Sequence, residues 1–202
     1  MIIIIDNYDS FTYNLVQYID QIADEVVVYK NDQITTEEVI ALRPDAIVLS
    51  PGPGSPQDTG VSREVLSACY LDIPILGVCL GYQLIVDFFG GRIEKGPLPV
   101  HGKVFSIVHD GQTMFKDIAL PTPVTRYHSL MANRDSIPDC LEVSAETEDG
   151  VIMAVRHTSL PIEGVQFHPE SITSIDGFSM LKNYFYHHVN SFRYRQKEGT
   201  NS

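Results

Sequence analysis

Residues 75–84, ILGVCLGYQL, join an apolar run to a segment with helical spacing of its apolar residues, and they place Cys79 between Gly77 and Gly81. The pattern predicts a buried strand that turns sharply into a helix. A G-x-C-x-G sequence at such a junction is typical of a nucleophile elbow in which sulfur replaces the hydroxyl. The glycines are expected to permit the strained turn and to leave its approach clear. A buried thiol beside two turn glycines is the simpler alternative.

The first half of the chain alternates apolar runs with amphipathic segments. We predict strands at residues 2–5, 25–30, 46–50 and 73–78, and helices near residues 11–22, 35–44, 61–70 and 80–89. Asp9 or Ser10 is expected to cap the first helix, and Thr35 with Glu38 forms a capping-box pattern. This order predicts an α/β fold with a mainly parallel twisted sheet flanked by helices. Such sheets bind ligands at the carboxyl ends of their strands, where the Cys79 turn lies.

The second half is rich in predicted strands, at residues 103–108, 124–128, 141–145, 151–157 and 161–167. A last amphipathic helix is predicted at residues 178–192. No linker, repeat or low-complexity segment interrupts the chain. We therefore expect a single domain over residues 1–192 and a disordered polar tail over residues 193–202.

The composition excludes several classes of protein. The net charge of −12 argues against a nucleic-acid partner, because phosphate binding requires clustered lysine and arginine. Three cysteines without metal-ligand spacing, Cys69, Cys79 and Cys140, predict neither a disulfide framework nor a metal site. The N-terminus lacks the features of a signal peptide, and no apolar run is long enough for a membrane helix. We expect a cytoplasmic protein without a membrane partner.

A thiol nucleophile needs a histidine, which is often oriented by a carboxylate. Among seven histidines, His168 ends the apolar run IEGVQF at the predicted ligand edge, and Glu170 follows two residues later. Residues i and i+2 of an extended segment face the same side, so Glu170 is expected to orient the histidine ring. The adjacent His187 and His188 face different directions on the last predicted helix and form a poor metal pair.

Backbone N–H groups are expected to complete the site around the thiol. The helix that begins near Leu80 directs its free N–H groups and its positive dipole end toward Cys79, which favours the thiolate. The N–H of Leu80 is placed to donate to an oxyanion. In the loop SPGPGSP at 50–56, Gly52 and Gly54 permit conformations that aim a second N–H inward. By itself this loop predicts only a turn.

Taken together, these motifs resemble those of the class I glutamine amidotransferases of the triad type. The resemblance rests on GVCLGYQ at 77–83, QFHPES at 166–171 and SPGPGSP at 50–56, and it covers about residues 1–190. It implies a flavodoxin-like three-layer architecture. DNYDSFTYNL at 6–15, HGK at 101–103 and RYHSL at 126–130 are similar to the small subunits of anthranilate synthase and aminodeoxychorismate synthase.

The resemblance implies a role for each matching residue. Cys79 would be the nucleophile, His168 the base and acid, and Glu170 the orienting carboxylate. The N–H groups of Gly52 and Leu80 would form the oxyanion hole. The glutamine substrate would be held by Gly52, Pro53, Gly54, Gln83, Ser129 and Leu130.

The same resemblance implies a partner and no cofactor. A large chorismate-binding synthase subunit would receive the ammonia, with His101, Gly102 and Lys103 near the interface. No metal or cofactor is expected in this chain. The main expectation is anthranilate synthase of tryptophan biosynthesis. Aminodeoxychorismate synthase of folate biosynthesis, or one subunit shared by both enzymes, is the alternative.

Two other classes of protein remain as alternatives. A cysteine hydrolase of the α/β-hydrolase type would also carry a nucleophile elbow, but its acid precedes its histidine along the chain, whereas Glu170 follows His168. A regulatory subunit could keep the fold without catalysis, although all three triad residues are present here.

Overall fold

The computed structural model describes residues 1–96 and 102–199. Its centre is a nine-stranded sheet of order β2-β1-β3-β4-β11-β10-β9-β6-β7. The strands are β1 (Ile2–Asp6), β2 (Val26–Lys30), β3 (Ala46–Leu49), β4 (Ile75–Val78), β6 (Lys103–His109), β7 (Thr122–Arg126), β9 (Leu141–Thr147), β10 (Ile152–His157) and β11 (Ile162–Val165). The strands from β2 to β11 in this order pair in parallel, and those from β11 to β7 pair antiparallel. The predicted α/β class is confirmed.

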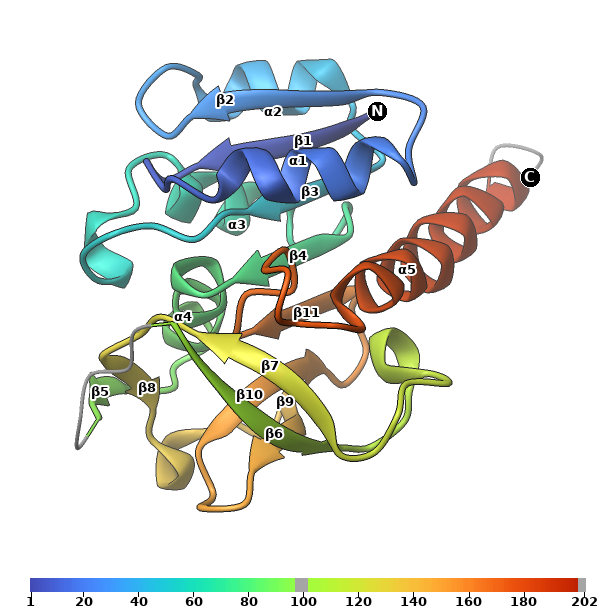
Figure 1. Ribbon diagram of the computed structural model, residues 1–202. Coiled ribbons are helices and arrows are strands. Elements are labelled where there is room, and N and C mark those ends of the chain that lie inside the picture. The colour runs from blue at the N-terminus through green and yellow to red at the C-terminus, as the bar shows by residue number, and fades with distance from the viewer. Residues whose placement is uncertain (97–101, 200–202) are drawn as a thin grey trace.

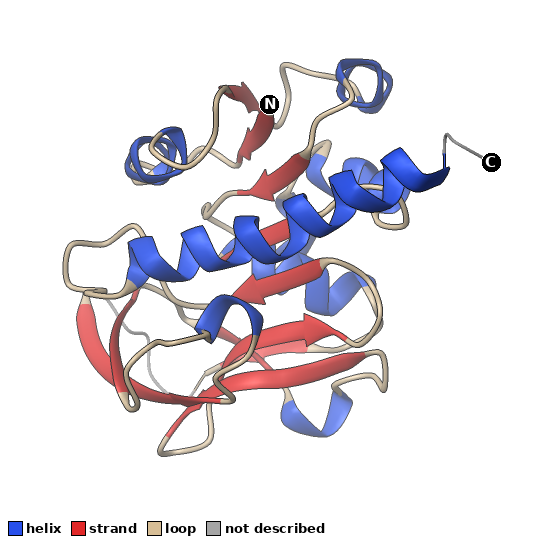
Figure 2. Ribbon diagram, turned by 90° about the vertical axis from the view of Figure 1, so that its right-hand side faces the viewer, coloured by secondary structure: helices blue, strands red, loops and turns tan. Residues whose placement is uncertain are grey.

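Helices cover both faces of the parallel half, as Figures 1 and 2 show. The α-helices are α1 (Thr12–Asp20), α2 (Thr36–Leu42), α3 (Ser62–Cys69), α4 (Leu80–Phe88) and α5 (Gly177–Gly199). Buried side chains of α1 and α5 share one apolar cluster with Ile2 and Ile4, whereas those of α2, α3 and α4 share another with Ile3 and Ile5. The alternation of neighbouring β1 side chains between the two clusters explains why this strand is apolar throughout.

Several short elements were not predicted from the sequence. β5 (Ile93–Lys95) and β8 (Leu130–Ala132) form a separate two-stranded antiparallel sheet. The single-turn 3₁₀ helices are η1 (Pro56–Asp58), η2 (Thr113–Phe115) and η3 (Arg134–Ser136). Three-residue elements are too short to show a periodic apolar pattern, so periodicity could not find them.

Several predicted boundaries were wrong. The first helix begins after Phe11 without a side-chain cap, because Asp9 accepts the Phe11 N–H (2.7 Å) in the preceding turn instead of capping. β7 ends at Arg126, so residues 127–128 lie outside the strand. α5 continues to Gly199, so the last helix includes residues 193–199 and extends beyond its predicted end at residue 192. That segment contains arginine, glutamine, lysine and glutamate, which are good helix formers.

Candidate functional site

Cys79 occupies the turn between β4 and α4, at the carboxyl end of the parallel strands. Its backbone has φ 52° and ψ −100°, a conformation that non-glycine residues rarely adopt. The Cys79 N–H donates to the Val165 carbonyl of β11 (2.8 Å), and its carbonyl accepts the Gln83 N–H (3.0 Å) in the first turn of α4. Bonds on both sides of the turn therefore hold the strained residue in place.

The two glycines beside the turn are needed because a side chain at either position would not fit. Neither adopts a positive φ; the strain lies at Cys79 itself. A Cβ on Gly81 would lie 2.2 Å from the Leu49 carbonyl oxygen of β3, and one on Gly77 would lie 2.5 Å from the Gly81 carbonyl. The glycines thus allow α4 to pack directly against the strand ends, which fixes the position of the thiol.

Gly52 lies next to Leu80, the other expected oxyanion donor. A Cβ on Gly52 would approach the Leu80 Cδ2 atom to 2.9 Å and Asn7 to 2.6 Å. Two residues later Gly54 has φ +87°, and both Pro53 and Gly54 are exposed. The structure therefore brings this loop against the start of α4.

Asn7 is hydrogen-bonded to Ser50 at the start of this loop, and its supporting role was not predicted from the sequence. It is buried, its side-chain N–H donates to the Ser50 carbonyl (2.9 Å), and its backbone N–H donates to Ser50 Oγ (2.8 Å). Its Oδ1 accepts from Asn31 (3.0 Å) and Ser62 (2.9 Å). A polar residue directly after a buried strand is the signal that could have drawn attention to it.

His168 and Glu170 form a buried pair, with His168 Nδ1 2.6 Å from Glu170 Oε1. The two residues lie in a turn closed by the Ser171 N–H and the His168 carbonyl (3.2 Å), not in the extended segment that the sequence suggested. The His168 N–H also donates to the Thr125 carbonyl of β7 (3.0 Å). The backbone therefore fixes the histidine independently of its ring.

The electrostatic surroundings favour a protonated His168. Burial lowers the pKa of His168, but the Cys79 sulfur and the Glu170 carboxylate raise it by more, so the pKa lies well above its ordinary value. His168 Nε2 is buried and makes no hydrogen bond of ordinary geometry within the described structure. The sulfur and the carboxylate therefore stabilise the charged form of the ring in a buried site with little water.

The other predicted substrate-binding residues lie beside α4. Gln83 is buried and not solvent-facing, and its Nε2 donates to Gln166 Oε1 (3.1 Å) and, at 3.4 Å, to the Leu130 carbonyl. Ser129 is exposed and its carbonyl accepts the Gly96 N–H (2.8 Å). Leu130 begins β8 and is half-buried. The structure therefore brings Gln83 and Leu130 together, whereas the Ser129 carbonyl contacts Gly96.

His128 links this group to β7. Arg126 Nε donates to His128 Nε2 (3.0 Å), and His128 Nδ1 lies 2.8 Å from the Leu130 carbonyl oxygen, which fixes a neutral tautomer that donates through Nδ1. Burial and the Arg126 guanidinium lower the pKa of His128 to about 4. His128 is therefore a neutral support for Leu130 near pH 7.

Aromatic rings flank His168. Phe11 and Tyr127 both lie edge-on to the imidazole, with ring centroids 6.0 and 5.1 Å away.

Of the three expected interface residues, Gly102 and Lys103 are exposed beside β7, and His101 lies outside the described residues. The thiols of Cys69 and Cys140 take no part in the site, and burial raises the pKa of Cys69 to about 11.

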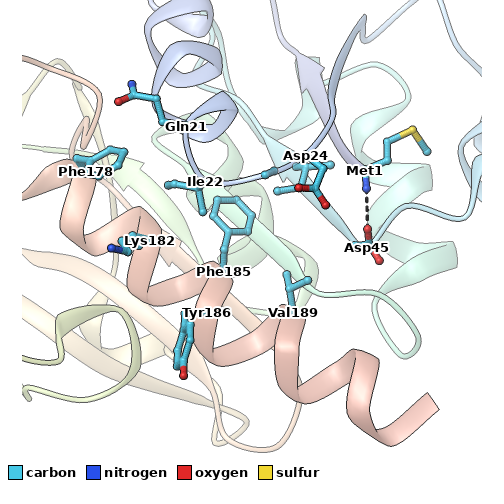
Figure 3. Close-up of a pocket in the computed structure, with 12 residues that line it drawn as sticks. Met1, Gln21, Ile22, Asp24, Asp45, Phe178, Lys182, Phe185, Tyr186 and Val189 are labelled. Atoms are coloured by element: carbon cyan, nitrogen blue, oxygen red, sulfur yellow. Dashed lines mark hydrogen bonds and ion pairs between the residues drawn. The ribbon is translucent and has the colours of Figure 1, made fainter. Parts of the chain in front are cut away.

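A separate pocket lies far from this chemistry. A cavity of about 280 Å³ lies between the end of α1, the start of β1 and α5. The Met1 ammonium pairs with Asp45 (2.6 Å) among the residues that line it (Figure 3). It opens at the amino ends of the parallel strands, opposite Cys79.

Within residues 1–96 and 102–199 no cluster of histidine, cysteine and acidic side chains could hold a metal ion. No helix in that part of the chain is long and apolar enough to cross a membrane.

Comparison with known proteins decides the family. The model of the family "Glutamine amidotransferase class-I" matches residues 3–188. The chain belongs to the class I glutamine amidotransferases. This assignment covers all elements that build the site and agrees with the resemblance of the three motifs.

Relatives of this amidotransferase are similar over nearly their whole length. It is 50% identical over 184 residues to aminodeoxychorismate/anthranilate synthase component 2 of Bacillus subtilis, covering 91% of this chain and 95% of that protein. It is 51% identical to anthranilate synthase component 2 of Azospirillum brasilense, with coverages of 91% and 94%. It is 46% identical to aminodeoxychorismate synthase component 2 of Escherichia coli, with coverages of 92% and 100%.

A solved structure confirms the fold of the amidotransferase. A protein from Thermoplasma acidophilum that is described as a GMP synthase subunit matches with a TM-score of 0.86 at 23% identity, covering 97% of this chain and 96% of that one. At this identity the match shows the fold alone.

Proposed function

We propose that this amidotransferase is the glutaminase subunit of a chorismate-using synthase in the cytoplasm. It hydrolyses L-glutamine through a thioester on Cys79 and delivers ammonia to a large synthase subunit, without a cofactor of its own. The observation that carries the proposal is the strained, buried Cys79 coupled to the buried His168–Glu170 pair. Relatives named as component 2 of two such synthases support the partner.

In the first step the Cys79 thiolate attacks the side-chain amide carbon of glutamine. The N–H groups of Leu80 and Gly52 stabilise the oxyanion of the tetrahedral intermediate, each contributing about 10²–10³ in rate. When the carbon–nitrogen bond breaks, the imidazolium of His168 protonates the leaving ammonia. The raised pKa of His168 fits this role, because the ring is protonated at neutral pH when the thiolate is present.

In the second step water attacks the γ-glutamyl thioester. Neutral His168 now accepts a proton from the water, the carbon–sulfur bond breaks, and glutamate leaves with the thiolate restored. Glu170 keeps Nδ1 of the ring paired through both steps, so Nε2 remains the nitrogen that exchanges protons.

A partner would dock over the edge that carries Cys79. Large apolar side chains are exposed around that edge, including Phe11 and Tyr13 at the start of α1 and Ile172 and Ile175 after Glu170. Apolar groups gathered beside a reactive thiol are typical of a protein interface. Such docking would also keep the released ammonia away from bulk water.

The pathway follows from the partner, and we place anthranilate synthase first. The named relatives include components of anthranilate synthase, of aminodeoxychorismate synthase and of both. Binding assays with the large subunit of each enzyme separate these possibilities. Tight binding only to the large subunit of anthranilate synthase supports the tryptophan pathway, and binding to both large subunits supports a shared role.

Replacing Cys79 by serine tests the proposed chemistry. In complex with the large subunit, the Cys79→Ser variant should lose synthesis from glutamine and keep synthesis from ammonium. Ammonium-dependent synthesis shows that the variant folds and docks. Full glutamine-dependent turnover by this variant would overturn the role of Cys79.

A further inference from the structure

Gln166 is a wholly buried polar residue next to the reactive thiol, and the mechanism above does not use it. It directly follows β11 and precedes His168 by two residues. Its backbone N–H donates to the Met153 carbonyl of β10 (2.8 Å). The neighbouring Val165 carbonyl accepts the Cys79 N–H, so the backbones of the two segments are tied at this point.

The side-chain amide of Gln166 lies between Cys79 and Gln83. Its Nε2 is 3.7 Å from Cys79 Sγ, a normal distance for a hydrogen bond to sulfur, and its Oε1 accepts from Gln83 Nε2 at 3.1 Å. Gln83 therefore fixes the orientation of the amide. With the oxygen facing the Gln83 amino group, the Gln166 amino group must face the sulfur.

This arrangement acts on the charged form of the cysteine. A thiolate accepts hydrogen bonds and cannot donate them, so an N–H directed at the sulfur stabilises the thiolate over the thiol. An amide does not titrate in the physiological range and cannot take the proton that His168 must handle. In a buried site, a neutral donor of this kind is also effective because no water competes for the sulfur.

The hydrogen bond between Gln83 and Gln166 also orients Gln83, which is one of the expected substrate-binding residues. Gln83 uses its amide nitrogen for two protein acceptors, Gln166 Oε1 and the Leu130 carbonyl. Neither contact uses the Gln83 carbonyl oxygen, which leaves this oxygen to accept a hydrogen bond from a ligand. A glutamine substrate carries an α-ammonium group, which needs such an acceptor.

We propose that Gln166 is a positioning residue that donates a hydrogen bond to the Cys79 thiolate and sets the orientation of the Gln83 amide. It thereby links the nucleophile to the substrate pocket. The inference rests on the proposed role of Cys79 and goes beyond the Cys79–His168–Glu170 triad.

The test replaces Gln166 by methionine, which is similar in volume and lacks the donor. Alkylation of Cys79 by iodoacetamide is followed against pH, with the modified peptide quantified by mass spectrometry so that Cys69 and Cys140 do not interfere. We expect the midpoint of the profile to move up by about one pH unit and the rate near neutral pH to fall up to about tenfold. Gln33→Met, at an exposed position, is the matched control and should leave the profile unchanged.

Steady-state kinetics in the complex with the large subunit supply the second readout. The Gln166→Met variant should show a lower kcat from glutamine and a higher KM for glutamine, with ammonium-dependent synthesis unchanged. Gln166→Glu, which is isosteric and places an acceptor where Nε2 donated, should move the alkylation profile in the same direction. An unchanged profile in both variants overturns the proposal for Gln166. It leaves the role of Cys79 intact, because that role is decided by the Cys79→Ser variant.

Discussion

Glu170 Oε1 lies 2.6 Å from His168 Nδ1 inside a single buried turn. A carboxylate that close holds the ring in one orientation and stabilises its positive charge. The Cys79 sulfur acts on the same ring, and it and Glu170 raise the pKa of His168 against the effect of burial. The pair is therefore a preformed unit that does not depend on bound substrate.

Glu170→Gln is expected to keep the shape of this turn and remove its charge. The pKa of His168 should fall, because the carboxylate that raises it is gone. We expect glutamine-dependent kcat to drop about 10²–10⁴-fold, with the limb of the pH–rate profile that reports His168 moving to lower pH. Ammonium-dependent synthesis in the complex serves as the control for folding. An unshifted limb would show that Glu170 does not act on the ring.

Gly81→Ala is expected to destabilise the protein and displace the thiol. The added Cβ would lie 2.2 Å from the Leu49 carbonyl oxygen, a backbone atom that cannot move aside without shifting β3. Overpacking of this kind costs about 1–3 kcal/mol in the free energy of unfolding, which urea denaturation measures. Gly111→Asn is the control, since Gly111 faces open space at a φ of +71° that asparagine tolerates. Equal stability of the two variants would contradict close packing at Gly81.

The chemistry of the site could be predicted from sequence where it is local. Cys79 and its glycines lie within five residues, and His168 and Glu170 are two apart, so short patterns indicated both. The hydrogen bonds that support the site join residues far apart in the sequence. Gln83 and Gln166 are 83 positions apart, and Asn7 and Ser50 are 43 apart. No spacing rule joins residues across such distances, because only the sheet order places β11 beside β4 and β1 beside β3.

The same limit explains the errors in the fold. The main strands and helices were predictable because each is an apolar run or a periodic segment between turn residues. β5 and β8 are three residues each and exist as a pair across residues 93–132, which local patterns do not reveal. The first predicted helix included Phe11, but Phe11 precedes α1, is partly exposed and lies edge-on to His168. Its position follows from the turn that Asp9 forms.

Asn7→Asp is expected to weaken the loop that carries Gly52. The substitution removes the N–H that donates to the Ser50 carbonyl and places a carboxylate in a buried site. Loss of a buried donor and burial of an unpaired charge cost about 1–3 kcal/mol or more, measured by urea denaturation. Glutamine-dependent kcat should fall as well, while Asn14→Asp, on the exposed face of α1, should change neither value. Unaltered activity in Asn7→Asp would show that this support does not reach the oxyanion hole.

His128 is expected to make stability depend on pH between about 6.5 and 4. Burial and Arg126 lower its folded-state pKa to about 4, so the unfolded chain binds the proton first as the pH falls and the free energy of unfolding decreases. At pH 5 the loss from this residue is about 2 kcal/mol. His168 acts in the opposite direction because its pKa is raised, so the test is a difference between proteins. Urea denaturation at pH 7 and pH 5 should show a loss about 2 kcal/mol smaller in His128→Gln than in the unmodified protein. Parallel pH curves for the two proteins would mean that His128 is protonated as easily in the folded state as in the unfolded one.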